Sequence, residues 1–94
     1  MYERILQQMR DKIRTRRYVV TIHAEEEMDE DNLSIFDVES IVLSGKIHER
    51  QKDTETAEWK YLITGETLAG EEATIVGKLS VTEKLVIITI YRGQ

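Results

Sequence analysis

Basic and aromatic side chains on three expected strands have the chemistry of metal-free RNA cleavage. That reaction needs a base for the 2′-hydroxyl, cations for the pentavalent phosphorane and an acid for the leaving 5′-oxygen. Lys60, Lys78 and Arg92 each lie on a different strand, and if the strands pair in order they converge on one sheet face near Tyr61 or Tyr91. The plainer interpretation is three ordinary charges on a solvent-exposed face, and the residues alone favour it.

His23 lies where an expected strand gives way to an acidic helix. An imidazole at such a place can act as a general base or acid near neutral pH. The alternative is a structural histidine whose ring contacts a neighbouring carbonyl or carboxylate. No cysteine, HExxH motif or EF-hand loop accompanies it, so we expect neither a bound metal nor any other cofactor.

Arg10, Arg14 and Arg17 recur at i, i+4 and i+7, a spacing that can place them on one stripe of the first helix. Such a stripe can face the phosphates of a nucleic acid. Basic residues near the C-terminus of a helix also complement its dipole, and the sequence leaves the two explanations about equal. Together with Lys78, these arginines are our candidate RNA-binding residues.

Charge is unevenly distributed along the 94 residues, although the total of −5 argues mildly against a dedicated nucleic-acid binder. Residues 1–22 carry +4, residues 23–45 carry −8 with no lysine or arginine, and the remainder carries −1. The acidic run Glu25–Asp31 is better explained as a solvated helix face than as a docking surface for a basic partner. The basic N-terminal end can still meet a phosphate backbone.

Three helices and five strands follow from the periodicity of the apolar residues. Residues 2–16 form an amphipathic helix, residues 18–22 favour a short strand, and the acidic helix 24–31 ends at a left-handed Asn32. Ser34 begins the next helix with Asp37 in a variant capping box, and Gly45 ends it in a left-handed conformation. The later strands cover residues 47–51, 58–64, 73–79 and 85–91.

These elements predict an α+β fold in which N-terminal helices pack on one face of an antiparallel sheet of four strands, or alternatively five. The length suits one domain, residues 1–94. We expect a cytoplasmic protein with no membrane contact, because the first 17 residues are polar throughout and no apolar stretch reaches about 20 residues.

Several short motifs, in order and spacing, resemble the domain-of-unknown-function family 4258. They are Thr21-Ile22-His23-Ala24, Met28, Leu33-Ser34, Asp37-Val38, Val42-Leu43, Gly45-Lys46-Ile47, Lys60-Tyr61-Leu62-Ile63 and Val86-Ile87-Ile88-Thr89-Ile90-Tyr91-Arg92. The resemblance covers about residues 20–92 and leaves residues 1–19 as a separate N-terminal amphipathic helix. That family is similar in shape to the RelE/BrnT group of toxins. The resemblance therefore implies a RelE/BrnT-like fold and a type II toxin, a metal-independent mRNA endoribonuclease neutralised by an antitoxin of zinc-finger, helix-turn-helix type.

Carried over by position, His23 matches the family's His-Ala motif, and Tyr91 and Arg92 match its closing Tyr-Arg. Lys60 stands where the family often has arginine. The candidate catalytic residues are therefore His23, Lys60, Tyr91 and Arg92, with RNA as the expected substrate.

The chain departs from the family pattern at three positions. Glu27 and Asp31 occupy two usual arginine positions, and Asn32 replaces a glycine. Two cations replaced by two anions reverse the local field where phosphates would approach. The alternative function is thus a non-catalytic protein-interaction module or an inactive relative of the toxin fold, which binds a partner through the acidic helix or through an edge strand such as residues 47–51. Convergence of the cationic side chains and His23 in one groove would favour catalysis, and scatter would favour the module.

Overall fold

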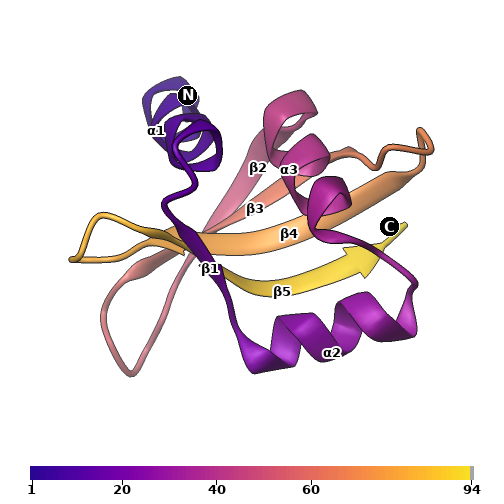
Figure 1. The fold of residues 1–94 in the computed structure, drawn as a ribbon. Coiled ribbons are helices and arrows are strands. Elements are labelled where there is room, and N and C mark those ends of the chain that lie inside the picture. The colour runs from indigo at the N-terminus through magenta and orange to yellow at the C-terminus, as the bar shows by residue number, and fades with distance from the viewer. Residues whose placement is uncertain (94) are drawn as a thin grey trace.

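The computed structural model describes residues 1–93, which form three helices and five strands (Figure 1). In chain order these elements are α1 (Glu3–Arg14), β1 (Tyr18–Val20), α2 (Ile22–Glu30), α3 (Ile35–Ser44), β2 (Lys46–Lys52), β3 (Trp59–Glu66), β4 (Glu72–Leu79) and β5 (Leu85–Arg92). The expected α+β class is confirmed.

The sheet has the strand order β1-β5-β4-β3-β2. Strands β2 to β5 form an antiparallel meander, whereas β1 pairs in parallel with β5, Tyr18 opposite Leu85 and Val20 opposite Ile87. The five-stranded alternative is therefore correct, and the expectation of a wholly antiparallel sheet is wrong for β1. Most of the chain separates β1 from β5, so no hairpin dictates their relative direction.

Helix α2 lies along the edge of β5 that the three-residue strand β1 leaves uncovered (Figure 1). The Glu27 carboxylate accepts a hydrogen bond from the Ile90 backbone N–H at 3.0 Å, and the Thr21 hydroxyl donates to the Ile88 carbonyl at 3.1 Å. Unpaired backbone groups at a sheet edge invite pairing with another chain. The two side chains of the α2 segment therefore replace part of a missing strand.

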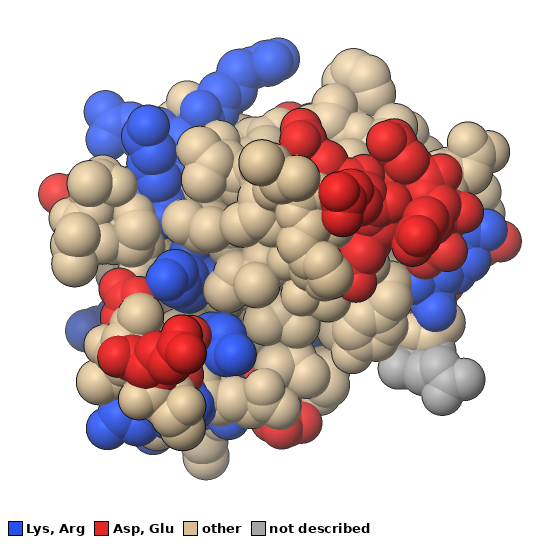
Figure 2. Space-filling view, turned by 90° about the horizontal axis from the view of Figure 1, so that it is seen from below, with Lys and Arg blue, Asp and Glu red and all other residues tan. Residues whose placement is uncertain are grey.

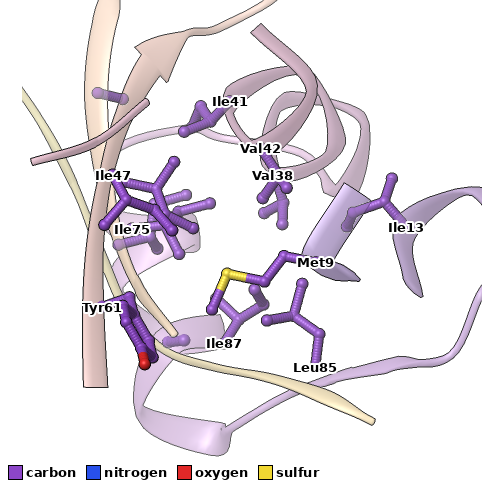
Figure 3. Close-up of a cluster of buried hydrophobic side chains, with 14 of the residues drawn as sticks. Met9, Ile13, Val38, Ile41, Val42, Ile47, Tyr61, Ile75, Leu85 and Ile87 are labelled. Atoms are coloured by element: carbon purple, nitrogen blue, oxygen red, sulfur yellow. The ribbon is translucent and has the colours of Figure 1, made fainter. Parts of the chain in front are cut away.

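Helices α1 and α3 cover one face of the sheet and enclose the core (Figures 1 and 3). The predicted apolar stripe of α1 is confirmed, because Leu6, Met9 and Ile13 are buried in the same cluster as the inward side chains of the strands. The largest fully buried members of that cluster are Met9, Val38, Ile41, Val42, Ile63, Ile75, Leu85, Ile87 and Ile90. The N-terminal helix is thus part of the core and not an appendage to it.

Strand β1 is joined to α3 by a side-chain hydrogen bond. The Tyr18 hydroxyl donates to Glu39 Oε2 at 2.6 Å. Burial of the phenol is the main reason that the pKa of Tyr18 is raised to about 12, and the hydrogen bond to the Glu39 carboxylate is the second. The hydroxyl is therefore a donor at every physiological pH.

The local signals for the helix ends around α3 are largely confirmed. Asn32 has φ of 59°, the expected left-handed value, and Ser34 and Asp37 form the predicted capping box. Gly45 is different: its φ of −91° is not left-handed, so that prediction is wrong. The glycine is required by close approach, because a Cβ there would lie 2.5 Å from the Ile41 carbonyl oxygen and 2.7 Å from that of Thr64.

We expect Asp37→Asn to lower the free energy of unfolding at pH 7 by about 1 kcal/mol, the usual effect of losing a helix cap. Burial alone would raise the pKa of Asp37, but hydrogen bonds from the backbone N–H groups of Ser34 and Leu68 outweigh it and lower the pKa. A carboxyl whose pKa is lowered on folding stabilises the fold above its unfolded value, near 4, and loses that effect as the pH falls through the folded value.

Urea denaturation at a series of pH values checks this prediction. The difference between the wild type and Asp37→Asn should shrink as the pH falls below about 4. Asp29→Asn, at an exposed position of α2 outside the capping box, is the matched control and should change the free energy of unfolding at pH 7 by less than about 0.5 kcal/mol. A difference for Asp37→Asn that stays constant from pH 7 to pH 3 would contradict the assignment.

Candidate nucleic-acid interface

The face of the sheet turned away from α1 and α3 carries several of the predicted site residues. Along β3, Tyr61 and Ile63 are buried on the helix side, whereas Lys60 and Leu62 alternate with them and remain half-exposed. We call this second surface the open face. On the three central strands its residues are Lys60, Leu62, Thr64, Glu66, Glu72, Thr74, Val76, Lys78, Val86, Thr89 and Tyr91.

Two lysines lie next to each other at one end of the open face. Lys60 and Lys78 flank the Tyr61–Gly77 pair on adjacent strands, as expected if β3 and β4 pair in order. Lys78 forms an ion pair with Glu58 at 2.8 Å, and this contact lowers the pKa of the Glu58 carboxyl. Among residues 1–93, Lys60 has no acidic side chain within 4 Å. Backbone N–H groups of Glu55 and Thr56, and after them the charges of Lys60 and Lys78, lower the pKa of Asp53.

Tyr91 lies toward the other end of the open face. It is paired with Thr74 on β4, and the Thr74 hydroxyl is 2.9 Å from that of Thr64. Thr74 and Lys78 are four positions apart on β4, which corresponds to about 13 Å along the strand. The long side chains of lysine and tyrosine must therefore extend towards each other to meet one ligand group.

His23 lies in the first turn of α2, the helix beside the edge of β5. Its Nε2 lies 3.3 Å from Glu27 Oε2, one helical turn further on, and the other oxygen of Glu27 accepts the hydrogen bond from Ile90. The histidine side chain is 66% exposed, so it can also reach a ligand. His23 therefore has the contact with a carboxylate that a structural histidine would make, and its imidazole is also accessible to solvent.

Arg92 is not on the open face. It lies opposite Ala73 in the sheet, its guanidinium donates to the Asp31 backbone carbonyl, and its Nη1 is 3.5 Å from Glu71 Oε1. These contacts fasten the end of β5 to the end of α2. The structure therefore brings Lys60 and Lys78 together and places Tyr91 on the same face, but leaves His23 on α2 and separates Arg92, so the full convergence in one groove that would favour catalysis is not present.

The three arginines near the N-terminus do not form a single stripe. Arg10 is partly buried and donates to the backbone carbonyls of Val42 at 3.2 Å and Gly45 at 2.8 Å, which caps the C-terminal end of α3. Arg14 is exposed and pairs with Asp11 at 3.2 Å, and Arg17 lies beyond the end of α1. Of these three candidates, Arg14 and Arg17 are exposed to solvent.

We expect Arg10→Ala to lower the free energy of unfolding by about 2 kcal/mol, because it leaves two carbonyls at the end of α3 without their charged donor. Arg14→Ala is the matched control on the same helix, and its exposed ion pair should contribute less than about 0.5 kcal/mol. Chemical denaturation of both variants measures the difference. Equal losses would show that the Arg10 hydrogen bonds do not stabilise the fold.

The sequence analysis missed a cluster of cations and an aromatic ring on the β2–β3 hairpin. The Arg50 guanidinium carbon lies 3.9 Å from the centre of the Trp59 ring, and Lys52 Nζ lies 5.7 Å from it. Trp59 is 39% exposed, and it is directly opposite Lys52 in the sheet. Such a pairing of cations with an exposed ring also suits nucleotide bases, and the alternation of Arg50 and Lys52 was its signal in the sequence.

Charges of opposite sign are separated on the molecular surface. Figure 2 shows a compact acidic patch where α2 lies, and most lysines and arginines in that view lie towards the other end. The exposed acidic residues of α2 are Glu25, Glu26, Asp29 and Glu30. The negative charge of α2 therefore repels a polyanion such as RNA from this part of the surface.

Comparison with known proteins gives a family and nothing beyond it. The model of a domain of unknown function (DUF4258) matches residues 20–92, which is most of the chain. The chain belongs to this DUF4258 family. No curated protein and no solved structure matches it significantly. Among residues 1–93 of this DUF4258 protein, no helix is long and apolar enough to cross a membrane.

The fold explains the acidic residue at one position where the family resemblance leads us to expect arginine. In this DUF4258 protein, Glu27 accepts a hydrogen bond from the edge of β5 and contacts His23. An arginine has no acceptor and cannot form either interaction. Asp31 differs, because Arg92 uses its backbone carbonyl, which every residue type provides.

Proposed function

We propose that this protein is the toxin of a type II toxin–antitoxin pair and cleaves mRNA on its open face without a metal. The observation that supports the proposal most directly is the position of Lys60 beside Lys78 on a face that no helix covers, with Tyr91 on the same face. Two lysines at neighbouring positions suit a phosphate, and Lys60 forms no ion pair within 4 Å among the described residues.

The proposed reaction needs only the RNA and protein side chains. The 2′-oxygen attacks the adjacent phosphorus, the bond to the 5′-oxygen breaks, and the products are a 2′,3′-cyclic phosphate and a free 5′-hydroxyl. Lys60 and Lys78 stabilise the charge of the phosphorane, and Tyr91 and His23 transfer the protons. Arg92 has no part in the step, since its guanidinium holds β5 to α2.

Incubation of the purified protein with single-stranded RNA in excess EDTA tests the proposal. We expect cleavage with 2′,3′-cyclic phosphate ends, and a marked loss of activity in His23→Ala. Induction in a heterologous bacterium should arrest growth with the wild type and not with that variant. Cleavage that requires a divalent metal, or that is unaffected by His23→Ala, would contradict the mechanism.

A second candidate function is a non-catalytic module that binds a protein partner, which in a toxin–antitoxin pair is the antitoxin. The observation in its favour is that Glu27 and Arg92 are occupied within the protein, while α2 presents four exposed acidic side chains. If the protein neither cleaves RNA nor arrests growth, its partners should be tested against Glu25→Lys, Glu26→Lys. Partner binding that is insensitive to this change would count against recognition through α2.

A further inference from the structure

A shallow apolar groove runs along the outer surface of α3, away from the sheet. Three apolar side chains form its walls and are unusually exposed: Phe36 at 61%, Leu43 at 40% and Leu68 at 68%. The groove has a volume of about 470 Å³, and its lining residues are Phe36, Glu39, Ser40, Leu43, Ser44 and Leu68. Adjacent exposed apolar side chains with a polar rim mark a protein-binding surface.

The groove is already formed, because side chains of α3 hold the segment after β3 against the helix. The Leu68 backbone N–H donates to Asp37 Oδ1 at 2.9 Å, and the Ser40 hydroxyl donates to the Glu66 carbonyl at 2.7 Å. The Glu66 N–H donates to the Ser44 hydroxyl at 2.9 Å. Binding of a partner therefore requires little ordering of this segment, and the entropic cost of that ordering is small.

The charge around the groove identifies the kind of partner. Helix α3 carries two acidic residues, Asp37 and Glu39, and no lysine or arginine, and Glu39 lines the groove. Glu39 is held in place by the Tyr18 hydroxyl. A second copy of this chain would oppose one acidic rim to another, which disfavours self-association.

Helical spacing identifies the shape of the partner. Phe36 and Leu43 are seven residues apart on α3, which is about 10 Å along the helix. Apolar residues at i, i+3 or i+4, and i+7 of a second helix have the same reach. We propose that the groove binds an amphipathic helix of a partner protein, with apolar residues on one face and lysine or arginine at its margins.

This inference is independent of the proposed RNA cleavage, because no lining residue of the groove belongs to the open face. Fluorescence anisotropy with a labelled 16-residue helical peptide of leucine and lysine tests it, the leucines being spaced i, i+3, i+7. The control peptide has the same composition in scrambled order and measures non-specific attraction to the acidic surface. We expect the wild-type protein to bind the first peptide at least tenfold more tightly than the second.

Two single variants and a matched control locate the binding site. Phe36→Ser and Leu68→Ser should each weaken binding of the amphipathic peptide at least tenfold, whereas Val81→Ser, at a 90% exposed apolar position in the β4–β5 turn, should not. Leu68 is outside the core, so its variant keeps the test valid if Phe36→Ser folds poorly. Equal binding of the two peptides, or equal effects of Val81→Ser and Leu68→Ser, would overturn the proposal. So would a wild-type dimer in sedimentation that Leu68→Ser converts to a monomer.

Discussion

Gly65→Ala should lower the free energy of unfolding by at least about 3 kcal/mol, the upper range for inserting atoms into a packed core. The last turn of α3 crosses β3 so closely that backbone meets backbone. A Cβ at Gly65 would collide with the Ile41 carbonyl oxygen and lie 2.9 Å from the Gly45 Cα. Neither atom belongs to a flexible side chain, so the helix itself must move away from the sheet.

Urea denaturation followed by circular dichroism measures this loss. The matched control is Gly93→Ala, where nothing lies within 4 Å of the added Cβ and only the φ of 78° opposes the substitution. That control should cost about 1 kcal/mol. If the two variants lose equal stability, the approach of α3 to β3 is looser than the structure has it, and the geometry around the α3 groove must be revised.

Helix ends could be predicted from the sequence because their determinants are local. Ser34 and Asp37 are three residues apart and bond only to each other's backbone and side chain, so the capping box is visible in the sequence. Asn32 likewise has its left-handed conformation for a local reason. At Gly45 the sequence predicted a left-handed conformation, whereas the glycine is needed because a side chain would meet the carbonyl oxygens of Ile41 and Thr64. Thr64 is 19 residues away, so a local pattern cannot reveal this contact.

The order and direction of the strands depend on contacts between distant segments. They could therefore be predicted from the sequence less completely than the helix ends. The order of β2 to β5 follows from short connections, so the neighbouring positions of Lys60 and Lys78 could be anticipated. The parallel pairing of β1 could not, because no turn fixes it.

Two cationic candidates make internal contacts that the sequence did not reveal, for a common physical reason. Arg92 and Arg10 both donate to backbone carbonyls, of Asp31 and of Val42 and Gly45 respectively. A carbonyl acceptor is present at every residue, so no sequence pattern distinguishes it. The carboxylate of Glu27 is a similar case, since its main contact is a backbone N–H of β5. Each of these side chains looks functional in the sequence and fastens two elements together in the fold.

Lys60→Ala should lower the rate of RNA cleavage about a hundredfold, the usual effect of removing one group that stabilises developing charge in a transition state. The lysine lies on the open face without an acidic partner among residues 1–93, so its removal should change the stability by less than about 0.5 kcal/mol. Lys60→Arg should retain most of the activity, because a guanidinium at this position keeps the cation and adds donors. Lys84→Ala, at an exposed lysine in the β4–β5 turn, removes the same charge from another place and should leave the rate unchanged.

The comparison of Lys60→Ala with Lys84→Ala separates a local effect from a general loss of positive charge. Equal losses in the two variants would mean that RNA is held by non-specific attraction, and the assignment of Lys60 to the phosphorane would fail. Lys78→Ala is less informative by itself, because it releases the Glu58 carboxylate from its ion pair and adds an unpaired anion near the phosphate. The double change Lys78→Ala, Glu58→Gln removes both charges together. If that variant is as slow as Lys60→Ala, the two lysines act on the same phosphate.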